Sequence, residues 1–111
     1  MAFTPYHNIL GATAQDNELV AVGDILKRTI KSIQITNVDV SAEGTVSLYL
    51  YKYSTDTAPE EVIYILHDVV IPHTVSLLLD NASILGFDNK SYSLYMEVGA
   101  NDEMDVILST S

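Results

Sequence analysis

The sequence contains no cysteine and no tryptophan, and only five of its 111 residues are lysine or arginine. The absence of cysteine excludes disulfide bonds, thiolate nucleophiles and thiolate metal ligands. A chain of this length nevertheless buries roughly two-thirds of the surface that its unfolded form exposes, so no crosslink is needed for stability. We therefore expect one domain over residues 1–111.

Long apolar runs are also lacking. The apolar stretches are short and interrupted by charged residues, which argues against a membrane span. The first residues, MAFTPYHN, have no basic region followed by an apolar segment and so do not resemble a secretory signal. We expect a protein made in the cytoplasm, without export and without a membrane partner.

Positive charge is scarce, because fifteen acidic residues give a formal net charge of −10. Such a chain repels phosphates over most of its surface, so nucleic acid is not an expected partner. Three of the five basic residues, Lys27, Arg28 and Lys31, fall close together. They form either a solvated strand edge or a docking site for an acidic partner surface.

The apolar residues that are present recur at every second position, in runs separated by Gly, Asn, Asp, Ser and Pro. This period predicts strands and hardly any helix, apart from one possible helical turn over Asn81–Leu85. The fold class expected is all-β, an antiparallel β-sandwich of about seven to eight strands. Residues 1–25 are weakly patterned and could form an N-terminal arm. The expected strands are Tyr6–Ala12, Leu19–Val22, Thr29–Val38, Thr45–Tyr53, Glu61–Leu66, Val69–Leu79 (interrupted at Pro72 and His73), Tyr92–Val98 and Met104–Ser109.

Alternation also assigns one face of each strand to the core, and Gly44 is expected to take a positive φ in the turn before Thr45. Each fully buried aliphatic side chain contributes roughly 1.5–3 kcal/mol. The expected inward residues are Ile33, Ile35, Val46, Leu48, Leu50, Tyr92, Leu94, Met96, Val98, Met104, Val106 and Leu108.

No arrangement typical of catalysis or metal binding occurs. The three histidines, His7, His67 and His73, are dispersed and none has a second histidine at metal-ligand spacing. There is no G-x-S-x-G elbow, and adjacent acids occur only in expected turns, where side chains point into water. Two acidic turns, 80–89 and 99–105, lack the calcium-binding pattern of a helix-loop-helix site. We expect no enzyme activity, no metal and no cofactor.

Several strands are apolar on both faces, which a two-layer sandwich does not require. Tyr49, Tyr51 and Tyr53 share one face of a strand whose other face is aliphatic, and the run VIYIL at 62–66 is apolar throughout. Either the tyrosine rings lie on the surface with their hydroxyls in water, or a second body covers them. Three buried tyrosines would approach the roughly 800 Å² that each partner buries in an ordinary interface. Stacking on sugar rings is a further alternative, although that use favours tryptophan.

Much of the chain resembles small β-sandwich virion structural proteins of tailed bacteriophages. The matching stretches are TIKSIQITNVDVSAEGTVSLYLYK, YILHDVVIP with VSLLLD, and YSLYMEVGANDEMDVILSTS, so that the resemblance spans Thr29–Ser111. The family's usual turn after Ile-Pro contains a glycine, whereas here it reads Pro72-His73-Thr74-Val75.

The resemblance implies a non-enzymatic structural protein of the virion, most simply a capsid decoration or cement protein. It would self-associate as a homo-oligomer and bind the major capsid protein or another virion protein. A tail or neck position, or a receptor- or carbohydrate-binding module, is the alternative. The candidate interface residues are Tyr49, Tyr51, Tyr53, Lys27, Arg28 and Lys31.

Overall fold

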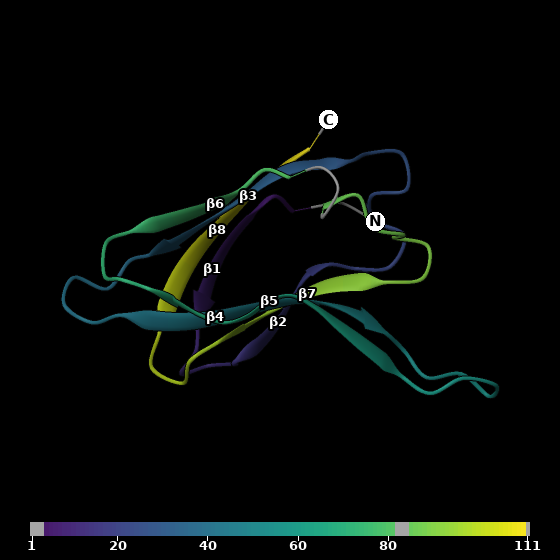
Figure 1. The fold of residues 1–111 in the computed structure, drawn as a ribbon, viewed down its shortest axis with the longest axis horizontal. Helices are drawn as coiled ribbons and strands as arrows, with labels where there is room; N and C mark the ends of the chain where they lie inside the picture. The colour runs from purple at the N-terminus through teal and green to yellow at the C-terminus, as the bar shows by residue number, and fades with distance from the viewer. Residues whose placement is uncertain (1–3, 82–84, 111) are drawn as a thin grey trace.

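A computed structural model describes residues 4–81 and 85–110 of the chain. They form eight strands in two antiparallel sheets of four strands each, which pack as a sandwich (Figure 1). The all-β fold class expected from the sequence is therefore confirmed. The strands are β1 Tyr6–Leu10, β2 Asp16–Val20, β3 Ile30–Asn37, β4 Gly44–Lys52, β5 Glu61–Ile71, β6 Ser76–Leu79, β7 Ser93–Val98 and β8 Glu103–Thr110.

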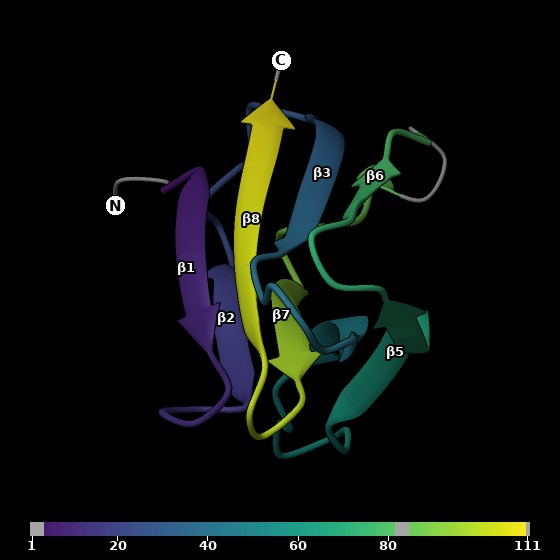
Figure 2. The same ribbon diagram turned by 90° about the vertical axis from the view of Figure 1, so that its left-hand side faces the viewer.

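The strand order is β1-β8-β3-β6 in one sheet, called sheet A below, and β2-β7-β4-β5 in the other, called sheet B. Every pair of consecutive strands except β4 and β5 lies in different sheets, so the chain crosses repeatedly between the two layers (Figure 2). Strands β5 and β6 are edge strands on the same side of the sandwich, one in each sheet (Figure 2).

The core lies between the sheets and is built from the alternate residues that the sequence assigned to it. Ile33 and Ile35 of sheet A and Val46 and Leu48 of sheet B are completely buried. Two expected core residues differ: Leu50 is only partly buried, and Tyr92 is half-buried and precedes β7. The remaining buried apolar side chains are Ile9, Leu19, Val20, Ile25, Ile30, Ile71, Leu85, Leu94, Met96, Val98, Met104, Val106 and Leu108.

The N-terminal segment, considered above as an arm, pairs with both sheets of this same domain. Strand β1 pairs with β8, and β2 pairs with β7. Residues Ile9, Leu19, Val20 and Ile25 belong to the core. These strands thus occupy the edges opposite β5 and β6.

Strand β5 continues through the point where the sequence indicated a break. The strands expected at Glu61–Leu66 and from Val69 onward are one strand as far as Ile71, with irregular register against β4 on both sides of Leu48. Asp68 sits in this irregular region with a φ of 52°, and its backbone N–H donates to the Ser47 hydroxyl. Local bulging, which alternation alone does not reveal, keeps the strand continuous.

The turn from β5 to β6 places Thr74 at a φ of 60°. This left-handed conformation is unusual for a β-branched residue and is one that glycine adopts without strain. The Thr74 hydroxyl donates to the carbonyl of His73, and its N–H donates to the carbonyl of Asp39. Pro72 ends β5 because it has no N–H to donate to a neighbouring strand.

Gly44 does not have the positive φ expected for it; among the described glycines that conformation occurs at Gly23, with a φ of 89°. A Cβ at this position would meet the terminal methyl group of the buried Met104 side chain, which would have to move aside. Close packing of the start of β4 against the start of β8 therefore fits this glycine better than turn geometry does.

The helical turn expected over Asn81–Leu85 lies mostly outside the described residues, although the Leu85 N–H donates to the Asn81 carbonyl. Within residues 4–81 and 85–110 no helix is long and apolar enough to cross a membrane.

The far ends of β4 and β5 form a hairpin that projects beyond the two-layer body, visible as the teal strands that extend away in Figure 1. Side chains on both faces of this end are exposed: Ile63, which shares a face with the inward Leu50, is 42% exposed, and Val62, on the tyrosine face, is 43% exposed. Nearer the start of β4, by contrast, Val46 and Leu48 are completely buried. The doubly apolar pattern of 62–66 therefore marks a hairpin end that the opposite sheet leaves uncovered.

Candidate functional site

The outward face of sheet B carries a row of aromatic side chains across three strands. Tyr49 of β4 lies opposite Tyr95 of β7 and opposite Tyr64 of β5. On the other side Tyr95 lies opposite Glu18 of β2. Alternation within β4 adds Tyr51 and Tyr53 to the same face, as the sequence indicated.

The rings pack against one another at differing angles. Tyr49 and Tyr95 are nearly parallel, with ring centroids 5.6 Å apart and an interplanar angle of 12°. Tyr51 is turned by 70° relative to Tyr95, and Tyr53 stands at 88° to Tyr51. The rings therefore form a corner with steeply inclined walls rather than one flat platform.

This corner encloses a hollow of about 330 Å³, called the tyrosine pocket below, which is lined by Asp16, Tyr49, Tyr51, Tyr53 and Tyr95. The Tyr49 hydroxyl donates to Asp16 Oδ1 at 2.8 Å, and the Tyr53 and Tyr95 hydroxyls are 3.2 Å apart. The Tyr51 hydroxyl donates to Glu60 Oε2. These bonds fix the rings, because each phenol is held at its polar end as well as at its ring.

Carboxylates dominate the electrostatics of the pocket. Burial, followed by the hydrogen bond to Asp16, raises the pKa of Tyr49 well above its usual value, and nearby Glu97 acts in the same direction. The hydrogen bond with Tyr53, then burial and the charge of Glu18, raise the pKa of Tyr95. The environment therefore favours the neutral forms of Tyr49 and Tyr95, and the surrounding carboxylates make the local potential negative.

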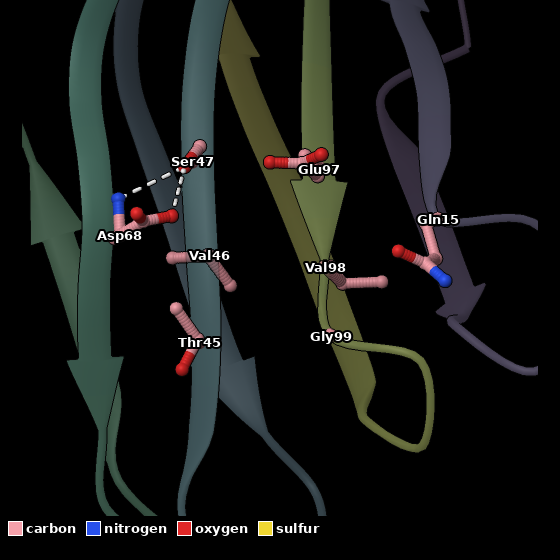
Figure 3. A pocket seen from close by; sticks show the side chains of 8 residues that line it. All are labelled: Gln15, Thr45, Val46, Ser47, Asp68, Glu97, Val98 and Gly99. Atoms are coloured by element: carbon pink, nitrogen blue, oxygen red, sulfur yellow. Dashed lines mark hydrogen bonds between the residues drawn. The ribbon is translucent and has the colours of Figure 1, made fainter.

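A second, more polar hollow of about 200 Å³ lies farther along the same sheet (Figure 3). Ser47 on β4 faces Asp68 on β5: its hydroxyl donates to Asp68 Oδ1 at 3.2 Å and accepts from the Asp68 N–H at 2.9 Å. Glu97 on β7 lies on the other side of Ser47. The Ser47 and Asp68 pair fixes the bulge in β5, which accounts for these residues without a ligand.

The structure does not bring the basic cluster to the tyrosine pocket. Lys27 and Arg28 lie exposed in the connection from β2 to β3, and Lys31 is exposed on β3 of sheet A. The tyrosines lie on sheet B. The two sets of candidate interface residues therefore belong to different surfaces.

The histidines and acidic turns take part in local hydrogen bonding. His7 contacts the carbonyl of Thr4 at 3.0 Å, and His67 is 3.6 Å from the carboxylate of Asp68 at the exposed surface. Asp102 accepts the N–H of Thr45, and Asp88 accepts the N–H of Lys90. Within the described ranges 4–81 and 85–110, three or more potential metal ligands do not cluster.

Sequence reasoning missed two members of the pocket. Tyr95 faces outward because its neighbours Leu94 and Met96 face inward, and the alternation of YSLYMEV contains that signal. Asp16 carried no local signal, since its position depends on β2 pairing with β7 and on the reach of Tyr49 across that strand.

Comparison with known proteins supports the fold and leaves the family open. No model of a known protein family matches the sequence, and no curated protein matches it. The crystal structure of PirA aligns with a TM-score of 0.54 at 11% identity, over 96% of this chain and 94% of that chain. At that identity the likeness shows the sandwich fold alone.

Two more distant structures align less well. One is a carbohydrate-binding module from a glycoside hydrolase family 9 protein (Cel9A) of Ruminococcus flavefaciens FD-1, with a TM-score of 0.44 and 10% identity over 97% of this chain and 99% of that one. The other is infectious bursal disease virus strain Gx, with a TM-score of 0.40 and 12% identity over 95% of this chain and 31% of that one.

Proposed function

We propose that this protein is a non-enzymatic structural component of a bacteriophage particle, a capsid decoration or cement protein that self-associates and binds the capsid lattice. The observation that carries the proposal is the exposed apolar end of the β4–β5 hairpin. Val62, Ile63 and Tyr64 are each more than 40% exposed, on both faces of an edge strand. Exposed apolar side chains gathered at one end of a hairpin are characteristic of protein interfaces.

The virion setting is supported by the resemblance of residues 29–111 to tailed-phage β-sandwich proteins. On a symmetric shell, each copy repeats the same modest contact many times, and avidity makes the whole attachment strong. The exposed Lys27, Arg28 and Lys31 would then steer docking toward acidic partner surfaces.

The proposal is tested by placing a charge on the hairpin end. Ile63→Asp introduces a carboxylate at a position that the interface would bury, whereas Ile107→Asp introduces the same charge at a residue of sheet A with nearly the same exposure, 41% against 42%. We expect wild-type protein to associate with itself and to bind assembled capsid lattice in sedimentation velocity. We expect Ile63→Asp to weaken both by about tenfold or more, because burying an unpaired charge is costly.

The Ile107→Asp control should behave like wild type. Wild-type protein that stays monomeric at high concentration and ignores the lattice would refute the proposal, as would equal effects of the two substitutions. Thermal melting of each variant confirms that the comparison is made between folded proteins.

A further inference from the structure

We infer that the tyrosine pocket binds an arginine side chain presented by a partner protein. The inference rests on the proposed function, because it names the chemistry of the partner at one part of the assembly surface. It is carried by three features of the described residues: the ring arrangement, the carboxylates around the rings, and the position of the basic side chains.

The shape of the pocket suits a compact planar cation better than a sugar. Pyranose rings stack on aromatic faces that lie open and flat, whereas here Tyr51 is turned by 70° from Tyr95 and Tyr53 by 88° from Tyr51. A guanidinium can stack on one ring and donate past its edge to groups on the adjoining wall. The hollow of about 330 Å³ is open to solvent, since Tyr53 is 52% exposed.

The charge of the pocket is complementary to such a group. Asp16 lines it, and its bond with Tyr49 engages Oδ1, so the carboxylate retains capacity for further donors. The other charged groups that act on the pocket tyrosines are Glu18, Glu60 and Glu97. A carboxylate beside aromatic rings gives a guanidinium both a hydrogen-bonded ion pair and a cation–π contact.

The protein's own basic side chains do not line this hollow. Lys52 points to the opposite face of β4, where its Nζ lies 5.9 Å from the centroid of the Tyr92 ring. His67 packs against Tyr64, which does not line the pocket. Tyrosine and arginine are the residues most often found at energetically important interface positions, which fits a partner arginine.

The direct test titrates the full-length chain with Nα-acetyl-arginine amide and follows the tyrosine ring signals by NMR. Nα-acetyl-citrulline amide, which has nearly the same shape without the charge, is the matched probe. We expect saturable shifts at Tyr49, Tyr51, Tyr53 and Tyr95 with arginine at millimolar concentration. Citrulline should bind at least tenfold more weakly, and added salt should weaken the arginine response.

Two variants locate the binding. Asp16→Asn removes the pocket charge and should weaken arginine binding about fivefold or more. Asp105→Asn is the matched control, because Asp105 is an exposed strand aspartate on sheet A that likewise accepts a side-chain hydrogen bond, from Asn8. It should leave the titration unchanged.

Equal binding of citrulline would overturn the inference, as would cellobiose binding in place of arginine. Tighter binding of choline than of arginine would overturn it too, because it would mark a site for alkylated ammonium groups. Ile63→Asp separates this inference from the proposed function, since Ile63 faces away from the tyrosines. An assembly-deficient Ile63→Asp protein that binds arginine normally supports the pocket. Wild-type protein that assembles but does not bind the arginine probe refutes only the pocket.

Discussion

The outward faces of the two sheets have similar positions in the sandwich, but the rows of side chains that cross them differ in chemistry. Across sheet A, Asn8 lies opposite Asp105, Asp105 opposite Thr36, and Thr36 opposite Ser76. Two of these pairs are hydrogen-bonded at 2.7 Å, Asn8 with Asp105 and Thr36 with Ser76. This row is polar, as is usual for a sheet face in contact with water, whereas the next row of the same face carries exposed apolar side chains, with Ile107 opposite Tyr6.

The equivalent row across sheet B is aromatic, with Tyr95, Tyr49 and Tyr64 on successive strands. The inward faces of the two sheets are alike, because the buried side chains at the centre of each are aliphatic or methionine. The two sheets therefore differ on their outward faces, which do not take part in the packing of one sheet on the other. The aromatic row supports the proposal that a partner covers this part of the outward face of sheet B.

The largest loss of stability is expected for substitutions on the inward faces, where the two sheets should be equally sensitive. Leu48→Ala removes a completely buried side chain from β4 and should lower the free energy of unfolding by about 2–5 kcal/mol. Tyr49→Ala, one residue away on the outward face, should cost clearly less, because its ring stays partly in water. Urea denaturation of both variants measures the difference; equal losses would show that Tyr49 serves the fold rather than a partner.

Substitutions on the outward faces should affect association when they lie on sheet B and not when they lie on sheet A, while both variants stay folded. Tyr49→Ser/Tyr51→Ser should weaken association, seen as a lower sedimentation coefficient, while the protein remains folded. Gln34→Ser/Thr36→Ser makes the corresponding double change on sheet A and should leave association unchanged. Identical association of the tyrosine variant and wild type would exclude this face of sheet B as an interface.

Most of the fold follows from alternation because the residues concerned obey one local rule. Ile33, Ile35, Val46, Leu48 and Met96 are buried as expected, since in each strand every second side chain must point at the opposite sheet. Alternation failed at Leu50, where the sequence pattern continues but the covering sheet does not. Where a sheet ends depends on its partner strands, and no single strand carries that information.

The candidate site was only partly predictable for the same reason. Tyr49, Tyr51 and Tyr53 share a strand, so their common face could be deduced. Tyr95 lies beside them because β7 pairs with β4, and Asp16 lies near them because β2 pairs with β7. Both depend on the strand order. Lys27, Arg28 and Lys31 were adjacent in sequence, yet the crossing from sheet B to sheet A carries them away from the tyrosines. Their role in steering remains a prediction.

A moderate loss of stability is expected at alkaline pH, and it should arise from the tyrosines of sheet B. The pKa values of Tyr49 and Tyr95 are raised in the folded protein from an ordinary value of 10.0, so folding favours their neutral forms. Stability should be complete below pH 10 and should then fall as the pH rises toward the folded pKa values, by no more than about 1.4 kcal/mol per pH unit for each phenol, because solvent screens both rings in part.

Chemical denaturation between pH 8 and 11, with ultraviolet titration of the phenols, measures this loss. Asp16→Asn should lower the pKa of Tyr49 without returning it to 10.0, because burial is the larger cause of the shift. Stability that is independent of pH over this range would mean that the pocket tyrosines are more hydrated than the packing of their rings indicates.

The smallest effect is expected in the turn that links the edge of sheet B to the edge of sheet A. Thr74 holds a φ of 60° there, which a β-branched side chain opposes and glycine permits. Thr74→Gly should raise the free energy of unfolding by about 0.5–1 kcal/mol, since relief of strain exceeds the added entropy of the unfolded chain. Thr13, an exposed threonine in the turn after β1, does not share the positive φ, so Thr13→Gly should lower stability instead. Thermal melts of the two variants that shift in the same direction would show that strain at Thr74 is too small to matter. Opposite shifts would show that the two sheets hold Thr74 in a backbone conformation that threonine disfavours.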